Sequence, residues 1–175
     1  MAKNPHVTTE DDDRKFRQAL KNLDLIDNSY VTVGVHQKEG TKQHVGITGK
    51  RSKATTAEVA FWNEFGTRKA PARPFMRSTM DENRKKFRAE INRLHAKAMI
   101  GEISVEHALD KSAFRIYTAM QERIQTSPSW AKPNKPSVQK AKARGGAVRN
   151  IPLIVTTLLY RSLTYRINLR GRNKE

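Results

Sequence analysis

Carboxylates and histidines are the side chains of this sequence that are suited to acid–base or metal chemistry. Glu58 and Glu64 are six residues apart on a predicted helix, which directs them to opposed faces and makes them a poor acid–base pair. The adjacent Asp11, Asp12 and Asp13 open another predicted helix, where acidic residues suit the positive end of the helix dipole better than they indicate a metal site. The five histidines lack the spacing of a metal-binding motif: His6, His36, His44, His95 and His107.

Other catalytic signatures are also missing from the sequence. It has no cysteine, which excludes disulfides, thiolate metal sites and a cysteine nucleophile. Neither standard glycine-rich phosphate loop occurs, and no serine lies in a nucleophile-elbow context. His95 and His107 lie on two helices that are expected to pair, but no set of carboxylates accompanies them, so we expect a surface or packing role. The sequence therefore predicts a protein that is not an enzyme and that has no cofactor and no metal site.

Positive charge is the strongest compositional signal. The chain of 175 residues has 34 Lys and Arg against 17 Asp and Glu, a net charge of +17. Residues 126–175 contain 11 basic residues and one acidic residue, so more than half of the excess lies there. Such a surface attracts polyanions or acidic partners. No segment approaches the roughly 20 apolar residues of a membrane span, and Met1–Pro5 lacks the start of a signal peptide, so we expect no membrane partner.

Hydrophobic periodicity predicts the elements that position these residues. A helix is expected over 11–22, with Phe16, Leu20 and Leu23 at helical spacing. The alternating valines of Tyr30–Val35 predict a strand, and the polar, glycine-containing residues 36–53 predict an extended loop or hairpin. A second helix begins after Thr55, which has capping-box spacing to Glu58, and ends at Gly66.

Two longer helices follow, over 81–99 and 105–125. Gly101 ends the first, Ser104 caps the second, and the short connection predicts an antiparallel helical hairpin. The proline- and lysine-rich residues 126–150 predict a basic loop, with one short helix at 136–143, that is mobile in the free subunit. A final strand is expected over 162–167. The apolar stripes of the two long helices are Phe87, Ile91, Leu94 and Ala98, and Leu109, Ala113, Ile116, Met120 and Ile124.

Together these elements predict an α+β fold, in which a small and mostly antiparallel sheet packs with helices that include the long hairpin. We expect three parts: an N-terminal helix or arm over 1–28, a domain over 29–169 that includes the basic loop 126–150, and a basic tail over 170–175.

The most specific motif lies at the end of the second predicted helix. It reads Asn-Glu-Phe-Gly-Thr followed by Pro-Ala-Arg-Pro-Phe, and its candidate assembly residues are Trp62, Asn63, Glu64, Phe65, Gly66, Thr67, Pro71, Arg73, Pro74 and Phe75. From residue types alone, we expect Glu64 and Arg73 to pair across the turn made by Gly66 and the prolines, with Phe65 and Phe75 packed beneath them. Such a corner would be rigid, and its residues do not form a catalytic arrangement. It either shapes an assembly surface or only supports the fold of the monomer.

The motif resembles the signature of tailed-phage tail-completion and neck proteins, the group that includes the minor tail protein Z type. The resemblance extends, in order, from the strand ending in Gly34-Val35 to Pro152-Leu153-Ile154, Ser162 and Tyr165, and spans about residues 30–168. Thr157 stands where the family usually has glycine, and residues 1–28 and 36–53 have no counterpart.

The resemblance implies a structural virion protein that completes the tail or joins tail to head at the neck, around the DNA path. It implies assembly in the host cytoplasm, location in the virion, and self-association in a ring such as a hexamer. The implied partners are the tail terminator, neck or connector proteins, and packaged DNA.

A second hypothesis is a cytoplasmic phage protein that binds nucleic acid without sequence preference. Its basis is the net charge and the basic loop, although no helix-turn-helix, zinc-finger or RNA-recognition signature is present. A small nuclease or toxin is a third class, but it lacks a carboxylate or histidine cluster. Under either of the first two hypotheses, six residues are candidates for contact with a polyanion or an acidic partner: Lys132, Lys135, Lys140, Lys142, Arg144 and Arg149.

Overall fold

The computed structural model describes residues 10–45, 51–144, 152–153, 158–170 and 172–173. Its helices are α1 (Glu10–Asp27), α2 (Gln37–Gly40), α3 (Thr56–Phe65), α4 (Phe75–Met99), α5 (Val105–Gln125), α6 (Ser127–Trp130), α7 (Pro136–Arg144) and α8 (Leu158–Ser162). Its strands are β1 (Tyr30–Val35), β2 (Gln43–Val45), β3 (Arg51–Thr55), β4 (Leu163–Leu169) and β5 (Arg172–Asn173). This confirms the predicted α+β class.

Two small antiparallel sheets accompany the helices. One has the strand order β1-β4-β5, and the other is the hairpin of β2 and β3. In the first sheet Tyr30 pairs with Asn168 and Val35 with Leu163, so segments from opposite ends of the sequence lie side by side. The predicted final strand is confirmed in type, but the structure places Ser162 at the end of α8 and continues the strand to Leu169.

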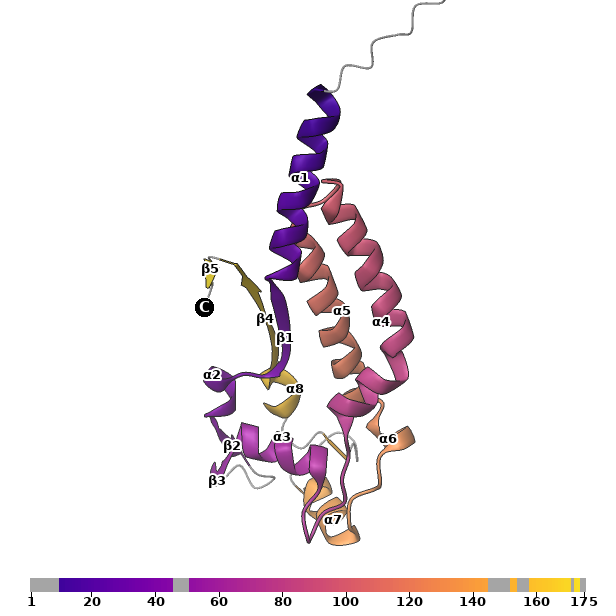
Figure 1. Cartoon of the computed structure of the whole chain (residues 1–175). Coiled ribbons are helices and arrows are strands. Elements are labelled where there is room, and N and C mark those ends of the chain that lie inside the picture. The colour runs from indigo at the N-terminus through magenta and orange to yellow at the C-terminus, as the bar shows by residue number, and fades with distance from the viewer. Residues whose placement is uncertain (1–9, 46–50, 145–151, 154–157, 171, 174–175) are drawn as a thin grey trace, which may run out of the picture.

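The antiparallel hairpin of α4 and α5 forms the long axis of the molecule, and β1 and β4 pack along it (Figure 1). Gly101 ends α4 with a φ of +82°, and the Ser104 hydroxyl accepts a hydrogen bond from the His107 backbone N–H, as expected of a helix cap. The hairpin prediction is therefore confirmed.

Two apolar clusters lie along this hairpin. The first contains Phe75, Phe87, Ile116, Met120 and Ile124 with residues of α3, α8 and β4, and the second contains Leu94, Ala98, Val105, Ala108 and Leu109. The predicted stripe of α5 is fully buried, and that of α4 is buried except for the partly buried Ile91. Burial of these side chains stabilises the fold by about 1.5–3 kcal/mol for each large one.

Two helix boundaries differ from those predicted. Helix α1 continues to Asp27 rather than ending at residue 22, and α4 begins at Phe75 rather than at residue 81. In the basic segment, the short helix predicted over 136–143 is confirmed as α7, whereas α6 was not predicted. Whether this segment is mobile in the free subunit stays a prediction.

Candidate functional site

Helix α3 carries the first half of the motif and is held by local interactions at both ends. Thr55 and Glu58 form the predicted capping box: the Thr55 hydroxyl accepts a hydrogen bond from the Glu58 backbone N–H, and the Glu58 carboxylate accepts one from the Thr55 backbone N–H. At the other end Gly66 has a φ of +79°, and a Cβ there would lie 2.8 Å from the Ala72 backbone nitrogen. Glycine is therefore required at this turn.

Glu64 is buried and caps a different helix from its own. Its carboxylate oxygens accept hydrogen bonds from the backbone N–H groups of Met76 (3.0 Å) and Arg77 (2.9 Å), in the first turn of α4. The Arg77 side chain also donates to this carboxylate, from Nε at 3.1 Å, and to the Glu64 carbonyl, from Nη2 at 2.8 Å. Pro74, at the N-cap of α4, makes no side-chain cap bond, so Glu64 replaces the local cap. This explains why α4 starts six residues before the predicted boundary.

Arg73 is also buried, but it contacts a different part of the chain. Its Nε donates to the Lys132 carbonyl at 2.9 Å, and its Nη2 donates to the Pro133 carbonyl at 3.4 Å and to Oδ1 of Asn134 at 3.1 Å. Its backbone N–H donates to the Asn63 carbonyl at 2.6 Å. Arg73 therefore joins the motif to the segment between α6 and α7, and burial lowers the pKa of its guanidinium.

The predicted Glu64–Arg73 pair is wrong. The prediction assumed that the opposite charges of Glu64 and Arg73 would bring them together. Instead, the partners of the Glu64 carboxylate are the N-terminus of α4 and the side chain of Arg77. The expected packing of the two phenylalanines is also only half right. Phe75 is fully buried in the first apolar cluster, whereas Phe65 is exposed.

The remaining motif residues shape the turn between α3 and α4. The Thr67 backbone N–H donates to the Ala70 carbonyl at 2.8 Å, and the Thr67 hydroxyl accepts from the Ala70 backbone N–H at 3.0 Å. The Asn63 side chain donates to the Val59 carbonyl at 2.8 Å. Pro71 and Pro74 lie partly buried in the extended path that leads to Phe75.

Three aromatic side chains of α3 remain exposed on the outer face of this corner. Phe61, Trp62 and Phe65 are 59%, 42% and 55% exposed. The rings of Phe61 and Phe65 have centroids 4.7 Å apart, and the Arg77 guanidinium carbon lies 4.7 Å from the Phe65 ring centroid. A shallow pocket of about 240 Å³ lies beside these two rings, and its other lining residues include Val35, Ala57, Ala60 and Met76. We call this surface the aromatic groove.

Four of the six basic candidates are exposed to solvent. Lys132, Lys135, Lys140 and Arg144 are exposed, whereas Lys142 is only 2% exposed. Burial and the nearby Arg73 lower the pKa of Lys142 to about 8. Lys142 is thus removed from the set of surface contacts, because a buried ammonium group is not presented to a partner. Arg149 lies outside the described residues.

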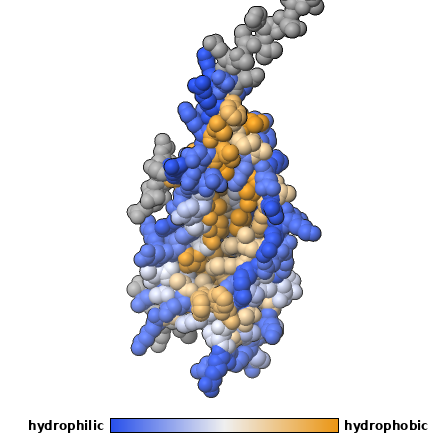
Figure 2. Space-filling view, in the orientation of Figure 1, coloured by the Kyte–Doolittle hydropathy of each residue, from blue (hydrophilic) through white to orange (hydrophobic). Residues whose placement is uncertain are grey.

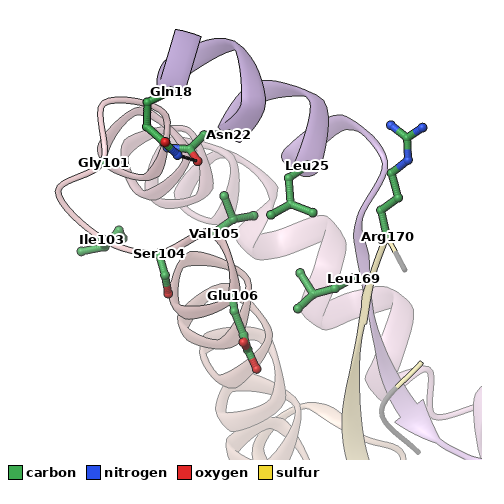
Figure 3. Close-up of a pocket in the computed structure, with 10 residues that line it drawn as sticks. All are labelled: Gln18, Asn22, Leu25, Gly101, Ile103, Ser104, Val105, Glu106, Leu169 and Arg170. Carbon is green, nitrogen blue, oxygen red and sulfur yellow. Dashed lines mark hydrogen bonds between the residues drawn. The ribbon is translucent and has the colours of Figure 1, made fainter. Parts of the chain in front are cut away.

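A second hollow, of about 650 Å³, lies between α1, the turn of the helical hairpin and the end of β4 (Figure 3). Leu25, Val105 and Leu169 supply apolar lining, and Gln18 donates from Nε2 to Oδ1 of Asn22 at 2.9 Å. Glu106 and Arg170 are the ionisable side chains that line it. The hollow is open and has amide side chains at its edge. Its lining suits contact with another molecule better than acid–base catalysis.

Histidines and carboxylates do not converge in the described ranges. No group of three or more His, Cys, Asp or Glu there is placed to hold a metal ion. His36 links the two main strands instead: its ring nitrogens lie 2.8 Å from the Thr32 hydroxyl and 2.7 Å from the Thr164 hydroxyl. Burial, then Arg166, lowers the pKa of His36, while Glu39 opposes this. In the same described part of the chain, no helix is both long and apolar enough to cross a membrane.

No family model, curated protein or solved structure matches this chain. A functional proposal for this chain therefore rests on the corner between α3 and α4 and on the surfaces exposed beside it. The sequence does not predict the aromatic groove, because the spacing of Phe61 and Phe65 is that of any apolar helix face. The structure adds that both rings are exposed, which the sequence does not reveal.

Proposed function

We propose that this chain is a structural virion protein of a tailed phage, which completes the tail or joins tail to head at the neck. The observation that carries the proposal is the corner between α3 and α4. Its residues match the tail-completion motif, and buried polar contacts by Glu64 and Arg73 hold it rigid. The same corner leaves Phe61, Trp62 and Phe65 exposed. A rigid corner that presents aromatic side chains suits a protein that works by contact with other subunits.

The surroundings of the corner support the same role. Large exposed aromatic side chains in one place are typical of protein–protein interfaces. The segment that Arg73 binds also provides positive charge near the corner. Its exposed cations are Lys132, Lys135, Lys140 and Arg144. This charge suits either packaged DNA or an acidic neck protein. In this proposal the chain acts as part of a ring, with the tail terminator and connector proteins as its neighbours.

Disruption of the gene in the phage genome that encodes this chain tests the proposal. We expect DNA-filled heads and separate tails to accumulate, because the joint between them is incomplete, and electron microscopy of the lysate measures this. Supplying the intact chain from a plasmid should restore joined particles. Normal yields of joined, infectious particles without the chain would contradict the proposal.

A second candidate function is sequence-independent binding of nucleic acid in the cytoplasm, favoured by the same four exposed cations and the net charge of +17. Replacing Lys132, Lys135, Lys140 and Arg144 together by Gln separates the two uses of this charge. If these cations contact phosphates, the slope of log affinity for duplex DNA against log salt should flatten by about three to four, since each contact contributes about 0.9. DNA sequence should have little effect.

A matched control replaces four exposed cations of α4 by Gln: Lys85, Lys86, Arg88 and Arg93. It removes the same net charge, and its salt slope should stay close to that of the unaltered chain. Equal flattening in both variants would show that net charge, and not this segment, governs DNA binding. An unchanged slope in the first variant, together with failed head–tail joining, would assign the four cations to an acidic neighbour.

A further inference from the structure

The aromatic groove is an apolar surface that the described part of the chain leaves uncovered. The exposed rings of Phe61 and Phe65 form one part of it, and the partly buried Met76 and Val35 line it as well. Figure 2 shows apolar surface in the region of α3, with hydrophilic side chains on both sides. An exposed apolar patch with a polar rim is typical of a site of contact with another molecule.

The size and lining of the groove limit what it can hold. Its volume of about 240 Å³ lies below the roughly 300–1,000 Å³ of a small-molecule site. Its lining is apolar apart from Glu64, whose carboxylate is already bonded to the N-terminus of α4 and to Arg77. Because this described lining leaves no polar side chain to orient a small ligand, the groove suits a large apolar side chain of a partner protein.

The elements around the groove present positive charge. Helix α2 and strands β2 and β3 contact α3, and the turn to α4 follows it directly. Among the side chains of residues 37–74 whose exposure the structure describes, Glu58 is the exposed acid, and its carboxylate accepts hydrogen bonds from Thr55. Five cations of the same set are exposed, and none forms an ion pair with a described residue: Lys38, Lys42, Lys53, Arg68 and Lys69.

Arg77 places a further guanidinium at the edge of the groove. Its Cζ lies 4.7 Å from the centroid of the Phe65 ring, and two hydrogen bonds to Glu64 hold it there. Glu64 neutralises much of this charge, so the attraction for a partner comes mainly from the five exposed cations. The fixed guanidinium still adds directional donors for a carboxylate that lies next to an apolar side chain in the groove.

We propose that the aromatic groove binds an acidic segment of a neighbouring protein. One large apolar side chain of that segment packs against Phe61 and Phe65, and the Asp or Glu side chains on either side of it face the exposed cations. The assignment of the neighbour to the neck or tail rests on the proposed function. The preference for an acidic segment rests on the groove itself, because complementary charge at the rim of an interface favours encounter and fixes its register.

Two other occupants match the groove less well. A second copy of the chain has 34 basic residues against 17 acidic ones, which suits a basic rim poorly. A single-stranded nucleic acid stacks its bases on open ring faces. Here the Phe61 and Phe65 rings lie against each other, with centroids 4.7 Å apart, and Arg77 lies against Phe65. An acidic protein segment therefore fits both the shape and the charge.

Binding of synthetic peptides to the purified chain, measured by fluorescence anisotropy, tests the proposal. The acidic probe is the labelled peptide GEDELFEDEG. The alanine probe replaces its Leu-Phe anchor by Ala-Ala, and the glutamine probe replaces every Asp and Glu by Gln. We expect the acidic probe to bind about ten- to hundredfold more tightly than the alanine probe, because a large apolar side chain is buried. It should also bind more tightly than the glutamine probe, by a factor that shrinks as salt is raised.

Two double variants locate this binding at the groove. Phe61→Ser with Phe65→Ser should abolish the preference for the acidic probe over the alanine probe. Arg68→Gln with Lys69→Gln should weaken binding of the acidic probe about three- to tenfold while keeping that preference, because the two cations lie outside the apolar surface. All four residues are exposed, and circular dichroism checks that the variants fold. If the serine variant fails to fold, the second variant and the three probes still decide.

Matched controls alter exposed residues elsewhere. Tyr30→Ser with Phe114→Ser removes two other exposed aromatic rings, and Lys85→Gln with Lys86→Gln removes the same charge from α4. Both controls should keep the affinity for the acidic probe and its preference over the alanine probe.

Equal affinity of the unaltered chain for the acidic and alanine probes would overturn the proposal, since charge alone would then explain binding. An unchanged preference in the folded serine variant would overturn it too. Binding of oligothymidylate that depends on Phe61 and Phe65 would assign the groove to nucleic acid instead. Self-association in sedimentation velocity that the serine variant loses would assign it to a second copy. These measurements use the purified chain, so their failure is distinct from failure of the genetic test of virion function.

Discussion

Glu64→Gln is expected to lower the free energy of unfolding by about 2–4 kcal/mol, because it removes a buried charge that accepts several hydrogen bonds. Both carboxylate oxygens accept backbone N–H groups of α4, from Met76 and Arg77. A Gln side chain would turn an NH₂ group toward one of these donors and would also lose the ion pair with Arg77. The helix would then begin with an unsatisfied N–H group. Urea denaturation measures the difference.

Glu58→Gln is the matched control, since Glu58 lies on the same helix but is exposed. It accepts hydrogen bonds from the backbone and hydroxyl of Thr55, within its own capping box. We expect a much smaller loss than for Glu64→Gln, because the Glu58 carboxylate is exposed and water can replace its partners. Equal losses for Glu58→Gln and Glu64→Gln would show that Glu64 acts only as a local helix residue and does not join α3 to α4.

Arg73→Met is expected to destabilise the fold by about 2–4 kcal/mol, because buried acceptors lose their charged donor. The Lys132 carbonyl and Oδ1 of Asn134 would both lose a hydrogen bond. Among the described residues, the buried Nδ2 of Asn134 has no hydrogen-bond partner, so the loss of Arg73 would also remove the partner that its Oδ1 has there. Thermal and urea unfolding measure the loss of stability.

Two further measurements make this prediction specific. Arg73→Lys should restore little stability, because one ammonium group does not reproduce the fork that reaches residues 132–134. In Arg73→Met, the pKa of Lys142 should rise above about 8, because Arg73 is one of the two causes that lower it. NMR titration of Lys142 measures this. Normal melting of Arg73→Met, with infectious particles assembled from it, would show that the corner does not depend on Arg73.

The helices were largely predictable from the sequence because their signals are local. The stripe from Leu109 to Ile124 recurs at helical spacing, and the caps at Ser104 and Gly101 are set by residues next to the helix ends. The start of α4 was not predictable in this way. Its cap is Glu64, which reaches it from another helix, and a pattern of neighbouring residues contains no signal for such a contact.

The candidate site was predictable in its residues but not in its contacts. The motif located the corner, yet residue charge alone favoured the wrong partner for Glu64, because it does not distinguish Arg73 from Arg77. Lys142 was assigned to the surface because lysine is rarely buried, and its burial depends on the packing around Arg73. For α1, helical spacing showed that Phe16 and Leu20 share a face, but it did not show that both side chains are exposed in the described part of the structure.

The most direct test of the virion role is the protein content of intact particles. Virions of the phage that is proposed to encode this chain would be purified on a density gradient and analysed by quantitative mass spectrometry, with antibody labelling seen by electron microscopy. We expect a fixed small number of copies in each particle, with label at the neck or the head-proximal end of the tail. Absence of the chain from intact, infectious virions, with all of it in the cytoplasmic fraction of the infected host, would contradict the account.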